Sequence, residues 1–544
     1  MIDAEINEYS EVPNVHPTFF CCMPTIEATE ATLKSLDEDS ALGPDKVPTR
    51  ILKRCAHALA PVLHKLIIRI LTFGEWPMLW MVHWVVPLHK RKSVYDTGNY
   101  RGIHLTSQIS KVAERIIASL FVPQLIFTGT YGRNQFAYMP ERGARDALAH
   151  LVLTWISLFA NKRKIAVHCS DVSGALDKVN SRRMLCKLRA RGVPMQILVV
   201  LQSWMKERKA RVAVGGKFSR DMNINNMVYQ GTVLGPPLWN VFYADAAVAV
   251  NMIEFLEIVF ADDLNCFKDF GLHIPNETLH AEMDRCQSEL HKLGKANQVS
   301  FDPAKESQHI LALNGGEGMN FKLLGIPFDN ALTMRDAVVE LVSEASWKLA
   351  SILRSGRFFT DGELVTLYKS QLLSYLEYRT AAIYHACNTV LAPLDSFQDW
   401  FLSEIGVSDA DALLHFNLAP LRCRRDIAML GLIHKCMLGK GPDHFKTFFQ
   451  ISTNQARNTR SGSARHGRQI IDIRNRRFLE VERRSALGFI WIYNRLPEAI
   501  VSNDNVKEFQ RNLQLLVKQR LLSGDPGWKH ILSPRIAVYR HPLR

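Results

Sequence analysis

The chain lacks the paired cysteines of a zinc finger or a disulfide-stabilised fold. Its ten cysteines are scattered over 544 residues, and no two have the spacing Cys-x-x-Cys. Scattered cysteines are typical of reduced thiols inside the cell. The chain also lacks the His-Glu-x-x-His motif of zinc proteases, the Gly-x-x-x-x-Gly-Lys-Ser/Thr loop of P-loop NTPases and any Cys/His finger. Those classes are therefore excluded.

No uninterrupted apolar run reaches the length of about 20 residues that a membrane-spanning helix needs. The richest apolar stretch, residues 233–260, is interrupted by Pro236, Pro237, Asp245, Glu254 and Glu257. The first residues, Met1 to Glu5, are too acidic and polar for a secretory signal. We therefore expect an intracellular protein without a membrane partner.

The charge is unevenly distributed along the chain. With 47% hydrophobic residues the composition is that of a globular protein and excludes global disorder. The formal net charge is +14, and residues 441–544 contain 19 basic and 8 acidic residues, a net of +11. A basic C-terminal part of this kind predicts a polyanionic partner such as nucleic acid.

The pattern of apolar residues changes from mixed to purely helical along the chain. Strands are expected at 80–88, 164–170 and 257–260, and a hairpin at 210–218. Helices are expected at 26–36, 49–71, 107–121, 144–159, 182–191 (with Ser181 as N-cap), 335–353, 361–378, 424–438 and 509–521. This order favours an α+β fold over a regular βα alternation.

Aspartates stand immediately after two of the expected strands. Asp171 comes after the strand at 164–170, and Asp262 and Asp263 come after the strand at 257–260. Three carboxylates at one place are what two Mg²⁺ ions need to hold the attacking and leaving oxygens of a phosphoryl transfer. Such aspartates also cap turns and helices, so the carboxylates alone leave both interpretations open.

A series of short motifs runs along the chain in a fixed order. The most distinctive are Gln-Gly-Thr-Val-Leu-Gly-Pro-Pro-Leu at 230–238 and Phe-Ala-Asp-Asp at 260–263. The others are Gly43-Pro44-Asp45, Asn99 to Ile103, Gln135-Phe136 with Arg142 and Asp146-Ala147, Asp171 to Asp177, Lys305, Leu324-Gly325 and Leu376 to Tyr378. In these motifs the chain resembles reverse transcriptases of non-LTR (LINE-type) retrotransposons, over residues 30–400 and more weakly to 520.

The resemblance implies a right-hand polymerase fold of the α+β class. A lead-in at 1–40 would precede fingers at 41–165, a palm with the catalytic carboxylates at 166–328, a helical thumb at 329–440 and a basic helical extension at 441–544. Tyr243-Ala244-Asp245 is similar to the start of the catalytic tetrad, but Ala246 follows it. We expect that segment to be helix.

The resemblance also implies a role for each matching residue. Asp171, Asp262 and Asp263 would bind two Mg²⁺ ions, with Mn²⁺ as the alternative metal. Lys90 and Arg101 would neutralise the incoming triphosphate, and a planar guanidinium suits two phosphate oxygens at once. Gln230 and Gly231 would lie under the template–nucleotide pair, and Lys305 would donate a proton to pyrophosphate. For Lys90 and Lys305 a solvated surface charge is the alternative.

Leu176 departs from the family pattern, which has an aromatic residue there that packs under the sugar and excludes a 2′-hydroxyl. Other departures are Gly102 for Pro, Ala137 for Gly, and Met139 for Arg. These changes are those of a drifted copy, whereas the three metal-binding acids are intact.

The basic extension is rich in arginine between positions 457 and 484. Nine arginines stand there against three acids. We expect Arg457, Arg460, Arg465, Arg468, Arg474, Arg476 and Arg477 to bind nucleic-acid phosphates, which gives affinity without sequence choice. A solvated, soluble surface is the alternative.

By this resemblance the chain is an RNA-directed DNA polymerase that adds deoxynucleotides to a primer 3′-hydroxyl by two-metal-ion phosphoryl transfer. Its implied partners are an RNA template, a DNA primer and deoxynucleoside triphosphates. The lead-in is too short for an endonuclease domain, so we expect the endonuclease to come from another chain or from a lost domain. The family implies a nuclear location, with a cytoplasmic ribonucleoprotein as the alternative.

Two rival functions remain at this point. One is a mobile-intron maturase, but the turn after Gln230-Gly231 usually continues to Ser-Pro in maturases, whereas here Leu234-Gly235-Pro236 follows. The other is an inactive RNA-binding scaffold that kept the fold, which the departures favour and the intact acids oppose.

Overall fold

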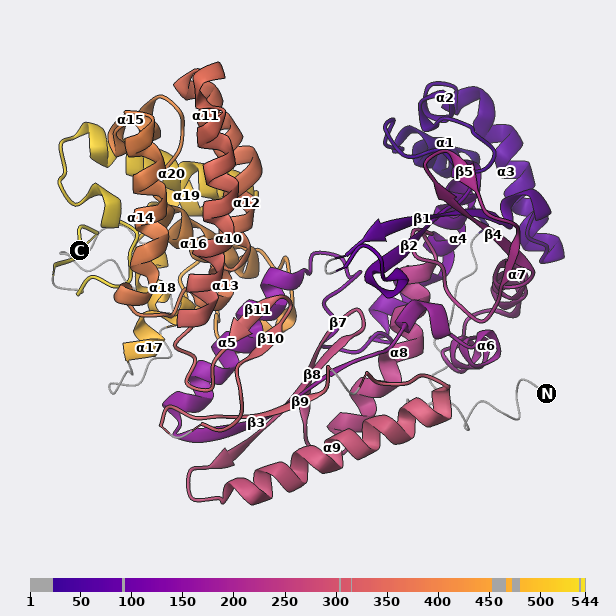
Figure 1. The fold of residues 1–544 in the computed structure, drawn as a ribbon, viewed down its shortest axis with the longest axis horizontal. Helices are drawn as coiled ribbons and strands as arrows, with labels where there is room; N and C mark the ends of the chain where they lie inside the picture. Colours follow the sequence, from indigo (N-terminus) through magenta and orange to yellow (C-terminus); the bar gives the residue numbers. More distant parts are fainter. Residues whose placement is uncertain are drawn as a thin grey trace. The chain divides into compact units, whose positions relative to one another are not determined.

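The computed structural model describes residues 23–90, 93–302, 305–314, 316–452, 466–471, 480–537 and 540–543. The chain divides into two compact units (Figure 1). Unit 1 contains Met1–Tyr138, Cys169–Cys266 and Asp284–Glu306, and unit 2 contains Met139–His168, Phe267–Met283 and Ser307–Arg544. The predicted boundaries of fingers, palm, thumb and extension stay predictions.

Unit 1 combines helices with a sheet whose first hairpin carries the predicted site residues Lys90 and Arg101. Its helices are α1 (Ile26–Lys34), α2 (Thr49–Arg54), α3 (Ala56–Phe73), α4 (Gln108–Phe127), α6 (Ser181–Ala190), α7 (Met195–Met205) and α8 (Gly235–Asn251). The single helix predicted at 49–71 is wrong: Cys55, with φ −94° and ψ 16°, ends α2 and starts α3. The N-cap of α6 is Asn180, not Ser181, since the Asn180 side chain accepts from the Arg183 N–H at 3.1 Å.

Helix α3 is long and apolar enough to cross a membrane if only its length and composition are considered. It has 18 residues and a mean hydropathy of 1.3, and no other helix in the described ranges meets the same criteria. Ala60, Ile67 and Leu71 are nevertheless buried, and α3 packs against α1 and α7. A single helix of this kind is a weak indication of membrane contact, because core helices share these properties.

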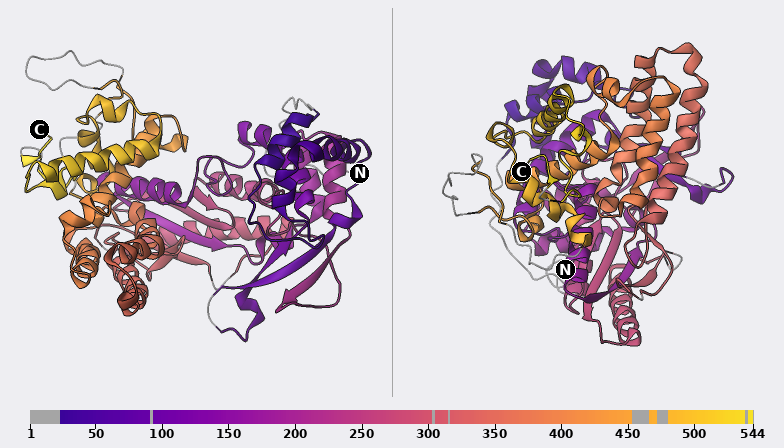
Figure 2. Two further views of the ribbon diagram at one scale, coloured as in Figure 1. Left: turned by 90° about the horizontal axis from the view of Figure 1, so that it is seen from above. Right: turned by 90° about the vertical axis from the view of Figure 1, so that its left-hand side faces the viewer.

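The first sheet of unit 1 brings distant segments together. It contains β1 (Val82–His89), β2 (Tyr100–Leu105), β4 (Arg208–Val214), β5 (Lys217–Phe218) and β6 (Met222–Ile224). β1 pairs with β2 in antiparallel register, Leu88 opposite Arg101, and with β4 in parallel (Figure 2). The predicted strand at 80–88 and the hairpin at 210–218 are confirmed. This register places Lys90 and Arg101 at the same end of the β1–β2 hairpin.

The second sheet has the strand order β7-β8-β3-β9. Its strands are β7 (Leu256–Phe260), β8 (Asp263–Gly271), β3 (Arg163–Asp171) and β9 (Ser307–Leu311). Strands β3 and β8 each pass from one unit into the other, as does helix α9 (Asn276–Asn297). The strands predicted at 164–170 and 257–260 are confirmed, and each ends at the predicted aspartates.

Unit 2 is mainly helical. Besides β9 and parts of β3 and β8, it contains the strands β10 (Phe321–Leu323) and β11 (Ile326–Phe328). Its helices are α5 (Ala144–Ala160), α10 (Arg335–Arg354), α11 (Asp361–Tyr368), α12 (Ser374–Tyr378), α13 (Thr380–Ile383), α14 (Asn388–Glu404), α15 (Asp409–Leu414), α16 (Leu421–Met437), α17 (Glu480–Arg483), α18 (Phe489–Tyr493), α19 (Glu498–Val501) and α20 (Val506–Leu522). The helix predicted at 361–378 is interrupted by a π-helical turn at Lys369–Leu373. Leu324-Gly325 form the turn of the β10–β11 hairpin, both with positive φ.

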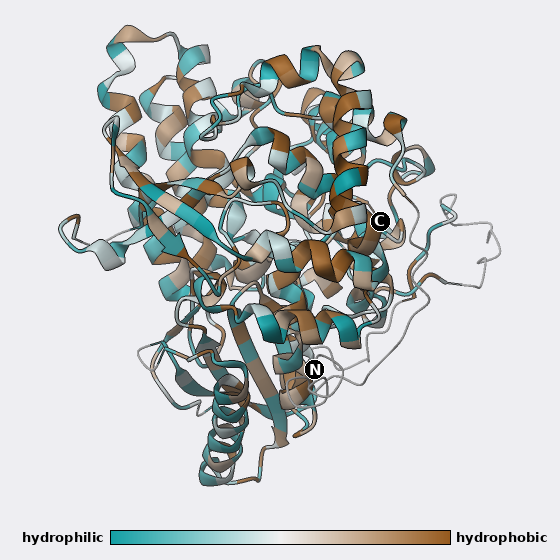
Figure 3. Cartoon of the chain, turned by 90° about the vertical axis from the view of Figure 1, so that its right-hand side faces the viewer, coloured by the Kyte–Doolittle hydropathy of each residue, from teal (hydrophilic) through white to brown (hydrophobic). Residues whose placement is uncertain are grey.

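Apolar and polar residues alternate along the helices and strands (Figure 3). Each element therefore has an apolar face that can be buried against its neighbours. In unit 2 the buried faces meet in one cluster. Leu153 of α5, Ile433 of α16, Phe489 of α18 and Leu513 of α20 belong to it and are almost completely buried. This cluster packs α16 and α20 side by side.

Candidate active site

A cavity of about 530 Å³ in unit 1 is lined by most of the residues predicted from the motifs. The predicted residues in its wall are Lys90, Arg101, Asp171, Leu176, Gln230, Gly231, Asp262 and Lys305. They come from the β1–β2 hairpin, the end of β3, the segment before α8 and the turn between β7 and β8. Asp263 follows Asp262 at the start of β8 and does not line the cavity.

The turn that carries Asp262 is held by the side chains of Gln135, which belongs to one of the motifs, and Trp239, to which the sequence assigned no role. Ala261 has a φ of +61°, a left-handed conformation that costs a non-glycine residue about 1–2 kcal/mol. The Gln135 Oε1 accepts a hydrogen bond from the Ala261 N–H at 3.2 Å. The Trp239 Nε1–H donates to the Ala261 carbonyl at 2.9 Å. Both partners fix the peptide immediately before Asp262, so the carboxylate is presented from a constrained backbone.

The three aspartates lie close enough for their charges to interact. Burial, and then the charges of Asp262 and Asp171, raise the pKa of Asp263 to about 7. Burial and the Asp171 charge also raise the pKa of Asp262. Carboxylates that repel one another in a partly buried place are stabilised by a cation. The electrostatics of the site therefore favour binding of positive charge.

Lys305 supplies one positive charge to this cluster. Its Nζ forms an ion pair with the Asp171 carboxylate, which raises the pKa of the ammonium, and it lies 3.9 Å from Asp302 Oδ2. The Asp302 N–H donates to the Asp171 carbonyl at 3.0 Å, which holds the Lys305 segment beside β3. In the residues that the structure describes, no three acidic, histidine or cysteine side chains are already arranged to hold a metal ion.

Gly231 is required by a close approach of two backbones. Its φ is +104°, and a Cβ at this position would lie 2.7 Å from the His104 carbonyl oxygen. The His104 N–H in turn donates to the Gln230 carbonyl at 2.7 Å. The Gln230 Oε1 is buried without a hydrogen-bond partner among the described residues. This cavity wall thus offers an unused acceptor to a ligand.

A buried chain of polar side chains supports His104 from behind. Arg208 Nη1 donates to His83 Nε2 at 2.7 Å, and the Nδ1 atoms of His83 and His104 lie 3.0 Å apart. Burial, followed by the Arg208 charge, lowers the pKa of both histidines, that of His104 to about 4. Because Arg208 can only donate, His83 must accept at Nε2 and donate from Nδ1. His104 therefore accepts at Nδ1, and both rings stay neutral.

Glu114 of α4 holds the other end of the same segment. Its side chain is fully buried, and Oε2 accepts from the Val233 N–H at 2.7 Å and from the Leu234 N–H at 3.2 Å. These N–H groups precede α8, which starts at Gly235. A carboxylate that accepts two backbone N–H groups is a strong anchor. The Gln230-Gly231 turn is consequently held between His104 and Glu114.

Lys90 and Arg101 are exposed on the β1–β2 hairpin. Across the described part of the chain neither cation forms an ion pair, although the Lys90 charge partly offsets the rise that burial causes in the pKa of Asp177. Leu176 lies in the 3-10 turn Ala175–Lys178, where its carbonyl accepts from the Val228 N–H at 2.8 Å. Leu176 lines the same cavity as the Gln230 turn.

Residues 243–245 are helical, as predicted, and Asp245 has a structural role. It lies within α8, and its Oδ2 is 2.9 Å from the Nζ of Lys187. Both side chains are only 2% exposed, and Lys187 also donates to the Phe242 carbonyl at 2.6 Å. The apparent second Asp tetrad is thus an internal ion pair of unit 1.

Most of the predicted arginine cluster lies outside the described residues: Arg457, Arg460, Arg465, Arg474, Arg476 and Arg477. Arg468 is described and belongs to unit 2. Its guanidinium donates to the Val501 carbonyl at 2.6 Å and pairs with Asp504 at 2.6 Å. Two of its nitrogens therefore hold the C-terminal fold together, and its role towards phosphates stays a prediction.

The fold and the carboxylate cavity define a class of protein. Residues 88–328 match the model of the family described as reverse transcriptase (RNA-dependent DNA polymerase). This stretch contains every predicted residue of the cavity and all strands of the two sheets except most of β1, which begins before it at Val82. Residues 88–328 are therefore similar to a reverse transcriptase domain, and they have a mixed helix and sheet fold.

More particularly, the chain is similar to RNA-directed DNA polymerases of LINE-like mobile elements. It is 25% identical over 401 residues to the RNA-directed DNA polymerase from mobile element jockey of Drosophila melanogaster, a match that covers 69% of this chain and 43% of that protein. It is 27% identical over 247 residues to the probable RNA-directed DNA polymerase from transposon BS of the same species, covering 44% and 27%.

The chain spans less than half the length of these curated relatives. Among solved structures, apo telomerase from Candida tropicalis, truncated from its C-terminal domain, superposes with a TM-score of 0.34 at 12% identity. That superposition covers 51% of this chain and 59% of the telomerase chain.

Proposed function

We propose that the chain is an RNA-directed DNA polymerase of a non-LTR retrotransposon that extends a primer 3′-hydroxyl on an RNA template. The observation that carries the proposal is the single cavity that gathers Asp171 and Asp262 with Arg101, Lys90 and Gln230 inside a reverse transcriptase domain. Carboxylates for metal, cations for phosphates and a backbone turn for the base pair are the three requirements of nucleotidyl transfer.

Asp171, Asp262 and Asp263 are proposed to hold two Mg²⁺ ions, with Mn²⁺ as a substitute. The fit rests on the burial and the repulsion by Asp262 and Asp171 that together raise the pKa of Asp263 to about 7, because a divalent cation would offset the cost of ionising these carboxyls side by side. Bound metal would supply the positive charge that phosphoryl transfer needs. The Lys305 side chain is 59% exposed, so it is free to leave Asp171 when a metal enters.

The chain's own residues then have separate tasks. Arg101 and Lys90, exposed at the hairpin end, would bind the triphosphate of a deoxynucleotide and orient it. Gly231 would let the backbone approach the template–nucleotide pair, and the free Gln230 Oε1 would accept a hydrogen bond there. Lys305, once released from Asp171, would donate a proton to the pyrophosphate oxygen that leaves.

The proposed partners are an RNA template, a DNA primer and deoxynucleoside triphosphates. An endonuclease from another chain or domain would supply the primer end, and the site of action would be the nucleus. The name of the jockey relative fits template-directed synthesis. The rival proposal, an RNA-binding scaffold without activity, rests on the departure at Leu176.

Primer extension on poly(rA)/oligo(dT) with Mg²⁺ separates the two proposals. The wild-type chain should extend the primer, and Asp262→Asn should abolish extension while leaving RNA binding nearly intact, because it removes a metal ligand and not a phosphate contact. Asp221→Asn is a matched control, since Asp221 is an exposed partner of Arg211 on the β4 hairpin. Extension by Asp262→Asn at the wild-type rate would refute the assignment of Asp262 as a metal ligand. If neither the wild type nor any variant extended the primer, the inactive RNA-binding scaffold would be the proposal that remains.

A further inference from the structure

A second cavity, of about 310 Å³, lies within unit 2 between α5, α16 and α20. Its polar lining residues are Arg145, Glu377, Asn417, Arg424, Lys507, Gln510, Arg511 and Gln514. Four of these side chains are cationic and one is anionic. The lining thus has an excess of three positive charges and several amides, and of these polar residues only Glu377 belongs to a motif described above.

The cations of this cavity are only partly neutralised by the protein. Arg424 Nε pairs with Glu377 at 2.5 Å, and Arg511 pairs at 2.7 Å with Glu508, which lies outside the cavity. In the part of the chain that the structure covers, neither Arg145 nor Lys507 has an ion-pair partner, and both are exposed. Two cations therefore stay available to an anionic ligand.

Further positive charge lies beside the cavity. Burial, and then the charges of Arg424 and Lys518, lower the pKa of Lys369, so these three cations are close enough to repel one another. Lys507, Arg511, Gln514 and Lys518 follow the i, i+4, i+7, i+11 spacing of one helix face, opposite the buried Phe509, Leu513 and Val517 of α20. Helix α20 thus buries an apolar face and presents a cationic one.

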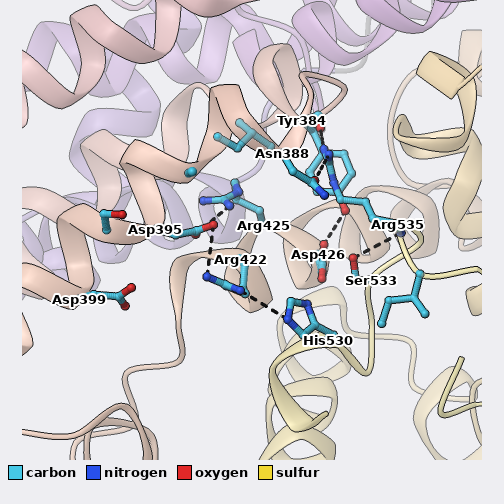
Figure 4. Close-up of a pocket in the computed structure, with 14 residues that line it drawn as sticks. Tyr384, Asn388, Asp395, Asp399, Arg422, Arg425, Asp426, His530, Ser533 and Arg535 are labelled. Carbon is cyan, nitrogen blue, oxygen red and sulfur yellow. Dashed lines mark hydrogen bonds and ion pairs between the residues drawn. The ribbon is translucent and has the colours of Figure 1, made fainter. Parts of the chain in front are cut away.

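Another cavity in unit 2 is also lined by charged side chains, but it has no excess of positive charge. That cavity, of about 400 Å³, contains three arginines and three aspartates (Figure 4). Arg425 pairs with Asp395 at 2.9 Å, the Tyr384 hydroxyl donates to Asp426 at 2.5 Å, and Arg535 donates to Asn388 Oδ1 at 2.8 Å. Three aspartates match its three arginines in number, and Arg422 and Arg425 both pair with Asp395, so this cavity has no comparable excess of positive charge for an anionic ligand.

We propose that the cavity between α5, α16 and α20 and the cationic face of α20 bind the sugar–phosphate backbone of a single-stranded nucleic acid. The row from Lys507 to Lys518 is about 16.5 Å long at 1.5 Å per residue, which corresponds to about five phosphate spacings of about 3.4 Å along the axis of one stacked strand. That length exceeds one triphosphate group and favours a polymer. The identity of the polyanion rests on the proposed polymerase function, for which this site would hold the strand away from the reacting atoms.

Binding of a fluorescein-labelled RNA 20-mer to the full chain, measured by anisotropy without nucleotides, tests this site. Lys507→Ala/Arg511→Ala should weaken RNA binding about tenfold at 0.2 M salt and lower the slope of log affinity against log salt by about 1.4, since each single-strand phosphate contact contributes about 0.7. The charge-matched control, Arg354→Ala/Lys446→Ala, removes two exposed cations of unit 2 outside the cavity and should change neither value.

Single-stranded DNA and deoxynucleoside triphosphate serve as the other two ligands. Equal losses for RNA and DNA 20-mers support backbone recognition. An unchanged salt slope in the double variant, or an equal loss in the control, would overturn the proposal, as would loss of triphosphate binding with RNA binding intact. If the double variant melts at a lower temperature than the wild type, Arg145→Ala repeats the test at another cation of the same cavity. It should also weaken RNA binding and lower the salt slope. Failure of the proposed polymerase would appear separately, as absent primer extension with these RNA-binding results unchanged.

Discussion

The Glu114 carboxylate accepts a hydrogen bond from the Val233 N–H at 2.7 Å, across 119 residues of sequence. This contact fixes the backbone that leads from the Gln230-Gly231 turn into α8. The turn forms one wall of the cavity, and its other contact is the His104 N–H. Glu114 is therefore a positioning residue, which acts on the proposed nucleotide site through the backbone and does not line the cavity itself.

Replacing Glu114 with Gln should slow nucleotide addition. An amide keeps the size of the side chain but loses the charge, and a hydrogen bond to a charged group is worth about 1.5–3 kcal/mol. We expect kcat/KM for a deoxynucleotide to fall about tenfold or more, which corresponds to about 1.4 kcal/mol. Single-nucleotide incorporation on a fixed primer–template measures this, with template affinity determined in parallel.

Ser110→Ala is the control for Glu114→Gln. The Ser110 hydroxyl donates to Glu114 Oε1 at 3.3 Å, so this change removes a weaker contact and leaves the bonds to Val233 and Leu234 in place. Its effect should be several times smaller. If Glu114→Gln added nucleotides as fast as the wild type, the turn would be held without the carboxylate and the positioning role would be wrong.

The predictable part of the site is the part that local sequence determines. The Asp262-Asp263 turn, the helix over Asp245 and the Leu324-Gly325 turn are short-range features, and the structure confirms where they lie. The gathering of Lys90, Arg101, Asp171 and Gln230 in one cavity agrees with the motif order. The roles of these residues in binding and catalysis stay predictions.

The supporting contacts could not be predicted, because they join residues far apart in the chain. Arg208 and His83 are 125 residues apart, and Gln135 and Ala261 are 126 apart. A buried histidine or glutamate has no local signature that distinguishes it from an exposed one. The break at Cys55 was missed for another reason. The spacing of apolar residues stays helical from 49 to 71, and this spacing does not reveal that one residue leaves the helical conformation.

The Leu176 position is predicted to control the choice of sugar. Leu176 lines the cavity proposed to bind the nucleotide, and a flat Phe ring in its place would fill the space beneath the sugar of that proposed ligand. Leu176→Phe should lower the ratio of ribonucleotide to deoxynucleotide incorporation about tenfold, a steric effect of about 1.4 kcal/mol, with little change for deoxynucleotides. Competitive incorporation of ATP and dATP measures the ratio. Leu176→Met, which conserves volume, should leave it unchanged, and equal ratios in all three forms would place the sugar gate elsewhere.

The buried pair of Lys187 and Asp245 is predicted to be essential for stability. Asp245→Asn leaves the Lys187 ammonium without its carboxylate in a place where both side chains are 2% exposed. Breaking such a pair costs about 3–5 kcal/mol, whereas an exposed pair is worth about 0–1 kcal/mol. Thermal melting should therefore show a large drop for Asp245→Asn and almost none for Asp221→Asn, whose pair with Arg211 is exposed. Equal melting temperatures would contradict a structural role for Asp245.

Glu257 gives unit 1 a predicted dependence of stability on pH. Its side chain is buried, Oε1 accepts from Asn134 Nδ2 at 2.9 Å, and Oε2 has no partner among the described residues. Burial raises the pKa of Glu257 from 4.5 to about 7. The folded state therefore binds this proton more tightly than the unfolded state, so the stabilisation is complete below pH 4.5 and is lost as the pH rises through about 7. The loss amounts to about 3 kcal/mol.

Glu257→Gln should remove this dependence, because the amide keeps the hydrogen bond to Asn134 and carries no charge at any pH. At pH 8.5, where the wild-type carboxylate is ionised and buried, the variant should melt several degrees higher than the wild type. At pH 5 the two melting temperatures should be close, since both side chains are then neutral in the folded state. Glu254→Gln, at an exposed position three residues earlier, is the control and should follow the wild type at both pH values. A constant difference between Glu257→Gln and the wild type from pH 5 to 8.5 would mean that Glu257 does not titrate in this range, and the pH dependence of unit 1 would have another origin.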